Sequence, residues 1–218
     1  MTRDRERPDQ IIDISILVNE FTPEWPGDTP FSCQWTWETA RGESVNVSCI
    51  NSSPHVGTHA DAPFHVDPRW PTSEALPLDA FSGPVTVVDV ANHRDAITID
   101  SLGNLAIRPV ERLLLRTGRT VADGPFPEGW PWLDEATVQE LLDRGLRLLG
   151  VDAPSVDARD SSTLTVHRAL FKGGASILEN LDLRAAPPGD YHLTAFPVRL
   201  AGLDAAPVRA VLRPLPSA

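Results

Sequence analysis

The stretch HVGTHADAPFH, residues 55–65, places three histidines and one aspartate within eleven positions of a chain that has only six histidines. Imidazole nitrogens and carboxylate oxygens are donors that zinc and its first-row neighbours accept. All four donor residues have odd numbers, so an extended chain would point their side chains to one face. The pattern indicates a metal site, and a polar, hydrogen-bonded loop is the alternative.

The distance along the chain between these residues indicates which of them can bind the same metal ion. A straight strand from His55 to His65 would span roughly 33 Å at about 3.3 Å per residue, whereas each ligand of a zinc ion lies about 2 Å from it. The chain must therefore bend, and the glycine and proline inside the stretch allow this. His59 and Asp61 can reach one metal from a single strand, and His55 can join them. We predict that His65 lies beside the metal as a general acid or base.

Two further donors stand downstream. His167 falls on the inward face of a predicted helix, and Glu179 follows an apolar, strand-like run that starts at Ala175. A glutamate after such a run is seldom buried without a partner, and a cation is one such partner. On the residues alone, an ordinary hydrogen bond or ion pair explains each of them equally well.

Composition narrows the class of protein. The 218 residues, 41% of them hydrophobic, fit a single domain over residues 1–218, with 1–10 as a flexible tail. The net charge of −11 and the lack of a basic run argue against a nucleic-acid partner. Cys33 and Cys49 occur in no metal-binding spacing, which predicts reduced, half-buried thiols. A charged N-terminus and the absence of a stretch of about 18 apolar residues predict a soluble, cytoplasmic protein without a membrane partner.

The periodicity of the sequence predicts an α/β fold, in which a mixed sheet is flanked by helices. Leu133–Gly145 is a predicted helix with Asp134 as its N-cap, and residues 162–172 form a second, with Ser161 or Ser162 as its N-cap. Several strand-like runs are too continuously apolar to be half-solvated, which favours strands covered on both faces. The predicted strands are residues 11–18, 45–50, 85–90, 112–116, 147–151, 192–196 and 208–212.

Five segments carry a family resemblance: WPGDTPF at 25–31, HVGTHADAPFH at 55–65, GGASILENL at 173–181, PGDY at 188–191 and AGLDAAPVRA at 201–210. Together they resemble the metal-dependent cyclase-like hydrolases, and most closely their bacterial kynurenine formamidase branch. The resemblance extends from about residue 11 to 213. It implies the swivelling α/β fold of that family and a homodimer.

The resemblance also implies a binuclear zinc centre, with two Zn²⁺ per subunit. It assigns His55, His59 and Asp61 to the first zinc, and Asp61 also to the second. His167 would bind the second zinc and Glu179 both. His65 would donate and accept protons. Trp25 would contact the substrate, because an indole plane suits an aryl group, whereas the other five tryptophans are expected to pack on the core.

The implied activity is hydrolysis of the small molecule N-formyl-L-kynurenine to L-kynurenine and formate in tryptophan degradation. One alternative is a sister hydrolase of the family that acts on another aryl or cyclic amide, such as isatin, with manganese as the metal. The other is a non-catalytic metal-binding protein on the same scaffold.

Overall fold

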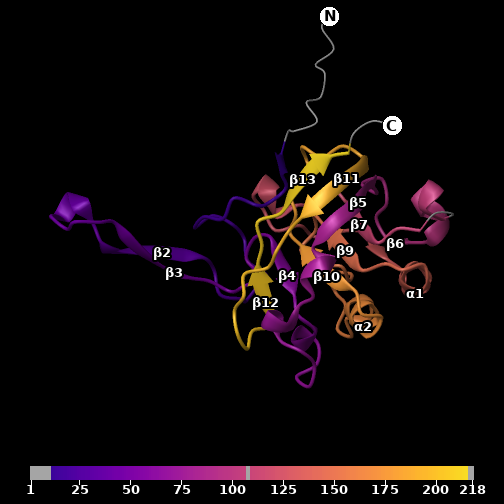
Figure 1. Cartoon of the computed structure of the whole chain (residues 1–218), viewed down its shortest axis with the longest axis horizontal. Helices are drawn as coiled ribbons and strands as arrows, with labels where there is room; N and C mark the ends of the chain where they lie inside the picture. Colours follow the sequence, from indigo (N-terminus) through magenta and orange to yellow (C-terminus); the bar gives the residue numbers. More distant parts are fainter. Residues whose placement is uncertain (1–10, 107–108, 216–218) are drawn as a thin grey trace, which may run out of the picture.

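A computed structural model describes residues 11–106 and 109–215, so the predicted N-terminal tail lies outside the described residues. Within those ranges, nine strands form one sheet in the order β1-β13-β11-β5-β7-β9-β10-β4-β12 (Figure 1). The strands are β1 Ile12–Asp13, β4 His59–Asp61, β5 Ser82–Asp89, β7 Arg112–Arg116, β9 Leu148–Val151, β10 Ser176–Glu179, β11 Gly189–Thr194, β12 Ala205–Pro207 and β13 Val211–Pro214.

The sheet is mixed, as predicted. Its central strands β5, β7, β9 and β10 are parallel, and the strands on either side of them pair antiparallel. The remaining strands form two small sheets outside the main one. In the first, β2 Ser32–Trp37 pairs with β3 Val47–Asn51, and in the second, β6 Ala96–Ile97 pairs with β8 Trp132–Leu133. Short 3-10 helices occupy Thr39–Arg41, Pro63–His65, Ser73–Ala75, Leu78–Ala80, Ile99–Ala106 and Val121–Asp123.

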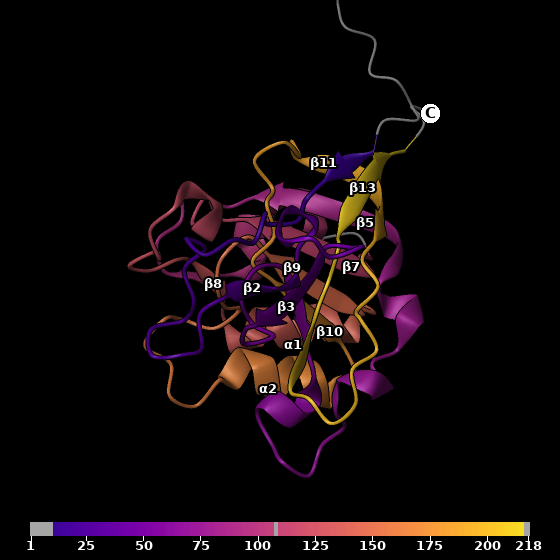
Figure 2. The same cartoon turned by 90° about the vertical axis from the view of Figure 1, so that its left-hand side faces the viewer.

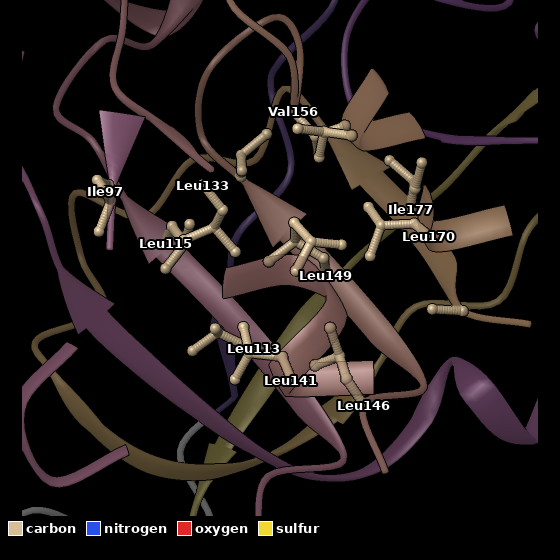
Figure 3. Close-up of a cluster of buried hydrophobic side chains, with 14 of the residues drawn as sticks. Ile97, Leu113, Leu115, Leu133, Leu141, Leu146, Leu149, Val156, Leu170 and Ile177 are labelled. Atoms are coloured by element: carbon tan, nitrogen blue, oxygen red, sulfur yellow. The ribbon is translucent and has the colours of Figure 1, made fainter. Parts of the chain in front are cut away.

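Two helices, α1 Glu135–Asp143 and α2 Thr165–Lys172, cover one face of the central strands. The side chain of Asp134 accepts a hydrogen bond from the Thr137 N–H at 2.7 Å, which confirms the predicted N-cap of α1. Leu141 of α1 and Leu170 of α2 are fully buried in this core, together with leucines of β7 and β9 (Figure 3). A second apolar cluster covers the opposite face. The central strands are therefore buried on both sides, which explains their continuous apolar sequence.

Several strand predictions differ from the structure in extent; the run 192–196, for example, belongs to the strand Gly189–Thr194. The run 11–18 pairs as a strand only at Ile12–Asp13, because the chain then leaves the sheet edge and Leu17 is exposed. The predicted strand 208–212 begins too early and ends too early: β12 ends at Pro207, and the next strand, β13, spans Val211–Pro214. Among the described residues, no helix has the length and apolar character needed to cross a membrane.

The run 45–50 forms a strand, but not in the main sheet. Together, β2 and β3 build a two-stranded arm, residues 32–51, that projects from the body (Figure 1). Trp35 and Trp37 are about half exposed on it, so the expectation that they pack on the core is wrong. Cys33 is partly buried as predicted, whereas Cys49 is exposed; both thiols are free. Alternating apolar residues indicate that one face of a strand is buried, but they do not indicate which surface buries it.

The tight packing of the central sheet generates a prediction. A Cβ atom added at Gly150 in β9 would lie 2.4 Å from Leu114 Cδ2 and 3.0 Å from Leu181 Cδ1. Gly150→Ala should therefore lower the free energy of unfolding by about 1–3 kcal/mol, measured by urea denaturation. Gly129→Ala is the matched control, because a Cβ atom there meets nothing within 4 Å, and it should change stability by less than about 0.5 kcal/mol. Equal stability of the two variants would contradict the packing argument.

Candidate functional site

The site begins with the pairing of β4 and β10. These strands are antiparallel, with Glu179 opposite His59 and Ile177 opposite Asp61. Directly paired residues share a face, and so do residues two apart on one strand. His59, Asp61 and Glu179 consequently point to the same side of the sheet, where all three are buried. The intervening Ala60 points into the apolar cluster on the other side.

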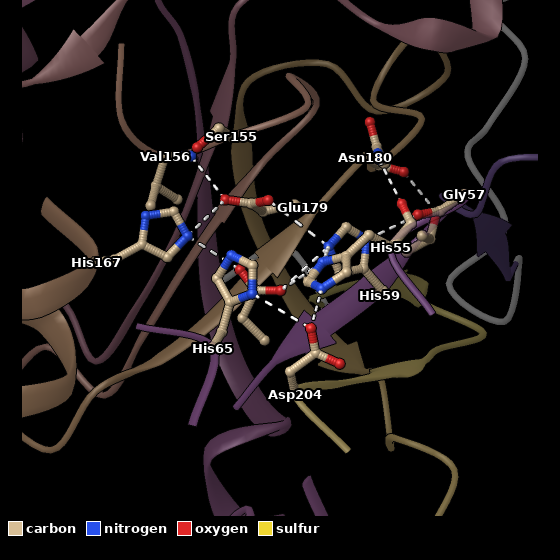
Figure 4. A network of polar contacts seen from close by, with 12 residues as sticks. His55, Gly57, His59, His65, Ser155, Val156, His167, Glu179, Asn180 and Asp204 are labelled. Atoms are coloured by element: carbon tan, nitrogen blue, oxygen red, sulfur yellow. Dashed lines mark hydrogen bonds and ion pairs between the residues drawn. The ribbon is translucent and has the colours of Figure 1, made fainter. Parts of the chain in front are cut away.

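A turn at Gly57 adds His55 to this group. Gly57 has φ +75°, in the left-handed region, and a Cβ atom there would lie 2.3 Å from Val18 Cγ2. Glycine therefore meets both the conformation and the close approach. The bend brings His55 Nδ1 to 3.0 Å from His59 Nε2 (Figure 4). The same His55 atom lies 3.2 Å from Asp61 Oδ1.

His167 approaches from α2 on the other side of Asp61. Its Nε2 atom lies 3.0 Å from Asp61 Oδ2 and 3.3 Å from Glu179 Oε1. Two groups of donor atoms thus flank one carboxylate. His55 and His59 face its Oδ1 atom, and His167, which also contacts Glu179, faces its Oδ2 atom. All five residues proposed as ligands are brought together.

The distances within the first group fit a metal ion. Asp61 Oδ1 lies 3.2 Å from both His55 Nδ1 and His59 Nε2, yet it is buried without a hydrogen-bond partner. Donors about 2 Å from a tetrahedral ion are separated from one another by roughly 3.3 Å. A buried carboxylate oxygen lacking a hydrogen bond is costly unless a cation compensates it. The residues present therefore fit a bound cation.

Each of these histidines has its other ring nitrogen held by an oxygen atom. His59 Nδ1 lies 2.9 Å from the carbonyl oxygen of Gly57, His55 Nε2 lies 3.0 Å from Asp204 Oδ2, and His167 Nδ1 lies 2.6 Å from Asp157 Oδ2. Such a bond fixes the tautomer and orientation of an imidazole and is typical of metal-binding histidines.

Asp157 also corrects the predicted start of the second helix. Helix α2 begins at Thr165, after Leu164 in the left-handed region at φ 50°, and not at residue 162. Ser161 Oγ accepts only from the Leu164 N–H. The N–H groups of the first turn, at Val166 and His167, donate to the carboxylate of Asp157 instead, each at 3.0 Å. The same carboxylate thus caps the helix and orients the His167 ring.

His65 lies at the edge of the cluster, in the 3-10 helix Pro63–His65. Its ring centroid is 4.6 Å from that of His55 and 5.8 Å from that of His167, and its Nδ1 atom lies 3.5 Å from Asp204 Oδ2. The side chain is partly exposed, unlike those of His59 and His167. The structure thus places His65 beside the buried donors.

Charges in the cluster compensate one another. Burial would lower the pKa of His55, but the hydrogen bond to Asp204 and the nearby negative charge of Asp61 outweigh burial and raise the pKa to about 10. Burial would raise the pKa of Asp61, but contacts with His167, His55 and His59 hold it well below the usual range. The hydrogen bond from His55 likewise depresses the pKa of Asp204. A cation that binds here displaces protons from these histidines.

The donor cluster opens into a cavity of about 510 Å³. Apolar side chains, among them Trp25, Phe126 and Leu164, form its walls, and His55, His65 and Glu179 line it as well. The Trp25 ring meets Phe126 edge-on, at a centroid distance of 5.4 Å. A cavity with aromatic walls and convergent polar groups suits a small aromatic molecule.

Several known proteins resemble this chain in sequence or in fold. The family model named Cyclase matches residues 12–158. Kynurenine formamidase of Bacillus cereus is 44% identical, covering 94% of this chain and 97% of that protein, and kynurenine formamidase of Salinibacter ruber is 43% identical, covering 94% and 98%. A solved structure described as a potential metal-dependent hydrolase with cyclase activity superposes with a TM-score of 0.80 at 29% identity, covering 95% and 99% of the two chains. Isatin hydrolase A of Labrenzia aggregata, at 24% identity, shares the fold with a TM-score of 0.78, covering 93% of each chain.

The two contacts of Asp157 with His167 generate a prediction. Asp157→Ala should weaken metal binding about 10–100-fold, measured by competition with a chelator, because the His167 ring loses its orienting partner. Ser161→Ala is the control: it removes a hydrogen bond at the same end of α2 without touching His167, and should leave the affinity unchanged. If Asp157→Ala does not fold, Asp157→Asn retains a carbonyl acceptor for the helix. Metal affinity at the wild-type level in a folded Asp157 variant would refute the orienting role.

Proposed function

Since the chain belongs to the Cyclase family, among its bacterial kynurenine formamidases, we propose that it hydrolyses the formamide of N-formyl-L-kynurenine to L-kynurenine and formate in tryptophan degradation. The observation that carries this proposal is the Asp61 carboxylate, whose two oxygen atoms each face a separate group of donors beneath an aromatic cavity. The donor cluster suits metal-dependent hydrolysis of a formamide, and the aromatic walls suit binding of the aryl group that carries it.

We assign two zinc ions to this cluster. His55, His59 and Asp61 would hold the first, and Asp61 and His167 the second. Glu179 would bind both, which its contacts support: Oε1 lies 3.3 Å from His167 Nε2, and Oε2 lies 3.6 Å from His59 Nε2. When bound, such ions polarise a carbonyl oxygen and lower the pKa of water from 15.7 toward about 7.

His65 moves the proton in this proposal. An anilide nitrogen leaves poorly as an anion, so it must receive a proton as the C–N bond breaks. His65 takes a proton from the attacking water and delivers it to that nitrogen, which releases the aniline and formate. Asp204 faces His65 Nδ1, which leaves Nε2 for the transfer.

The cavity walls orient the substrate. Trp25 and Phe126 present aromatic surface to the aryl ring, which directs the formamide group toward the polar end of the cavity. The same walls exclude bulk water from the reacting atoms.

Two further parts of the proposal rest on family membership, namely a homodimer and a cytoplasmic location beside the other steps of tryptophan breakdown. Two alternatives differ in chemistry. The isatin hydrolases share the fold, which keeps hydrolysis of a cyclic amide with manganese as a second candidate. A metal-binding protein without activity would need no proton-transferring histidine such as His65.

The first test measures formate release from N-formyl-L-kynurenine, together with elemental analysis of the purified protein. We expect turnover that a chelator abolishes and added zinc restores, and two equivalents of zinc per chain. Isatin, assayed in parallel, should be a poor substrate. Preferential hydrolysis of isatin would replace the formamidase assignment with the cyclic-amide one. Bound zinc without hydrolysis of either substrate would favour the non-catalytic alternative.

The second test removes the proton-transferring group. His65→Ala should lower kcat about 10²–10⁴-fold, the usual contribution of general acid–base catalysis, while the metal content stays at the wild-type level. His192→Ala is the matched control, because this histidine is exposed on β11 and does not line the cavity. Wild-type turnover in His65→Ala would show that another group carries the proton.

A further inference from the structure

Charge is unevenly distributed around the cavity that holds the donor cluster. Within the described part of the chain, no arginine or lysine lines this cavity. Two carboxylates do: Glu179 belongs to the donor cluster, whereas Asp28 stands apart from it, in the segment between β1 and β2. Asp28 is half-buried, and among the described residues it has no cationic partner. A carboxylate in a largely apolar wall is therefore left for a cation that a ligand supplies.

A tight turn places this carboxylate beside the aromatic wall. The Asp28 N–H donates to the carbonyl oxygen of Trp25 at 2.9 Å, which closes a turn over the sequence WPGD. Pro26 occupies its second position, and Gly27, with φ +94°, its third, which is the pattern of a type II turn. The Cα atoms at the two ends of such a turn are less than about 7 Å apart. Trp25 and Asp28 therefore form one unit of the cavity wall.

This unit lies at the entrance of the cavity. Trp25 is 40% exposed, whereas His59 and His167 in the donor cluster are almost completely buried. Figures 1 and 2 show the segment between β1 and β2 on the side of the body from which the arm projects. A molecule in the cavity consequently meets the buried donors at its inner part, and Trp25 with Asp28 where the cavity opens to solvent.

The covalent structure of the proposed substrate matches this arrangement. The formamide and the amino-acid side chain leave neighbouring carbons of the aryl ring, so the formamide can point into the donor cluster while the side chain follows the wall outward. Four bonds separate the ring from the ammonium nitrogen, a span of about 5 Å when extended. With the ring on Trp25, the ammonium group comes within reach of Asp28. An ammonium–carboxylate contact is a charge-assisted hydrogen bond, about twice as strong as a neutral one.

We propose that Asp28 determines specificity by binding the α-ammonium group of the substrate, so that the chain selects aryl formamides that carry an amino group. The α-carboxylate has no cation in the lining of the cavity and faces solvent at the entrance. An aryl formamide that carries a carboxylate without an amino group is repelled by Asp28. This inference rests on the proposed function and adds to it the chemical class of the preferred substrate.

The test first compares three substrates by formate release. They are N-formyl-L-kynurenine, its decarboxylated analogue, which keeps the amino group, and its deaminated analogue, which keeps the carboxylate. The KM of the decarboxylated analogue should stay within about threefold of the parent value, whereas the KM of the deaminated analogue should be at least about tenfold higher, because the charged hydrogen bond is lost. The difference should lie in KM, since the amino group takes no part in breaking the C–N bond.

The second part changes the carboxylate. Asp28→Asn retains an oxygen atom for the hydrogen bond from the Thr29 N–H, so the turn is preserved. The KM of both amino-bearing substrates should rise about 3–10-fold, as expected for a partly exposed charge pair, and that of the deaminated analogue should not rise. Glu24→Gln is the control, because it removes the same charge from the same segment but Glu24 does not line the cavity. It should leave all three KM values at the wild-type level.

The outcomes separate this inference from the proposed function. Equal KM values for the parent and the deaminated analogue, or equal effects of Asp28→Asn and Glu24→Gln, would overturn the inference while the formamidase activity stands. If no substrate releases formate, the proposed function fails, and calorimetry decides the inference without turnover. L-kynurenine should then bind the wild type more tightly than its deaminated form does, and this preference should disappear in Asp28→Asn. Equal affinities of the two molecules for the wild type would overturn the inference.

Discussion

The buried carboxylate of Asp61 is the constraint on which the rest of the site depends. A carboxylate without solvent is strongly disfavoured unless positive charge and hydrogen-bond donors surround it. Here three imidazoles converge on its two oxygens from β4, from the turn before β4 and from α2. The left-handed turn at Gly57 and the capping of α2 by Asp157 both serve to deliver those rings. The need to surround the Asp61 carboxylate with imidazoles therefore explains both of these features of the local backbone.

The sequence predicts those parts of the site that depend on local chain geometry. Alternation along one strand places His59 and Asp61 on the same face, and the apolar run before Glu179 marks a neighbouring buried strand. Asp204 was not predicted because it acts across the fold, 149 residues from His55. Asp157 lies only 10 residues before His167, in a loop, and was not predicted for a different reason. An aspartate in a loop before a helix is a signal for capping, but Ser161 and Ser162 lie closer to the helix and outweighed it.

The burial of the central strands on both faces was also predictable from the sequence. Continuous apolar strands such as β7 and β9 need cover on both faces, and α1 with the second apolar cluster supplies it. The arm also carries large apolar side chains, Trp35, Trp37 and Ile50, but they are exposed. The pattern of apolar residues predicts that a strand face is buried. It does not predict which surface covers that face, because the covering residues are distant in the sequence.

The double role of Asp157 has a consequence for how the family can diversify. The residues between Asp157 and Thr165 form an irregular, largely exposed connection, yet both of its ends are fixed by the same carboxylate. Insertions or deletions in this connection need not shift the helix or the His167 ring, because the anchor does not depend on the length of the connection. Leu164, on the cavity wall, belongs to the same stretch. Evolution can therefore reshape this part of the cavity, and with it the choice of substrate, while the donor cluster stays in place.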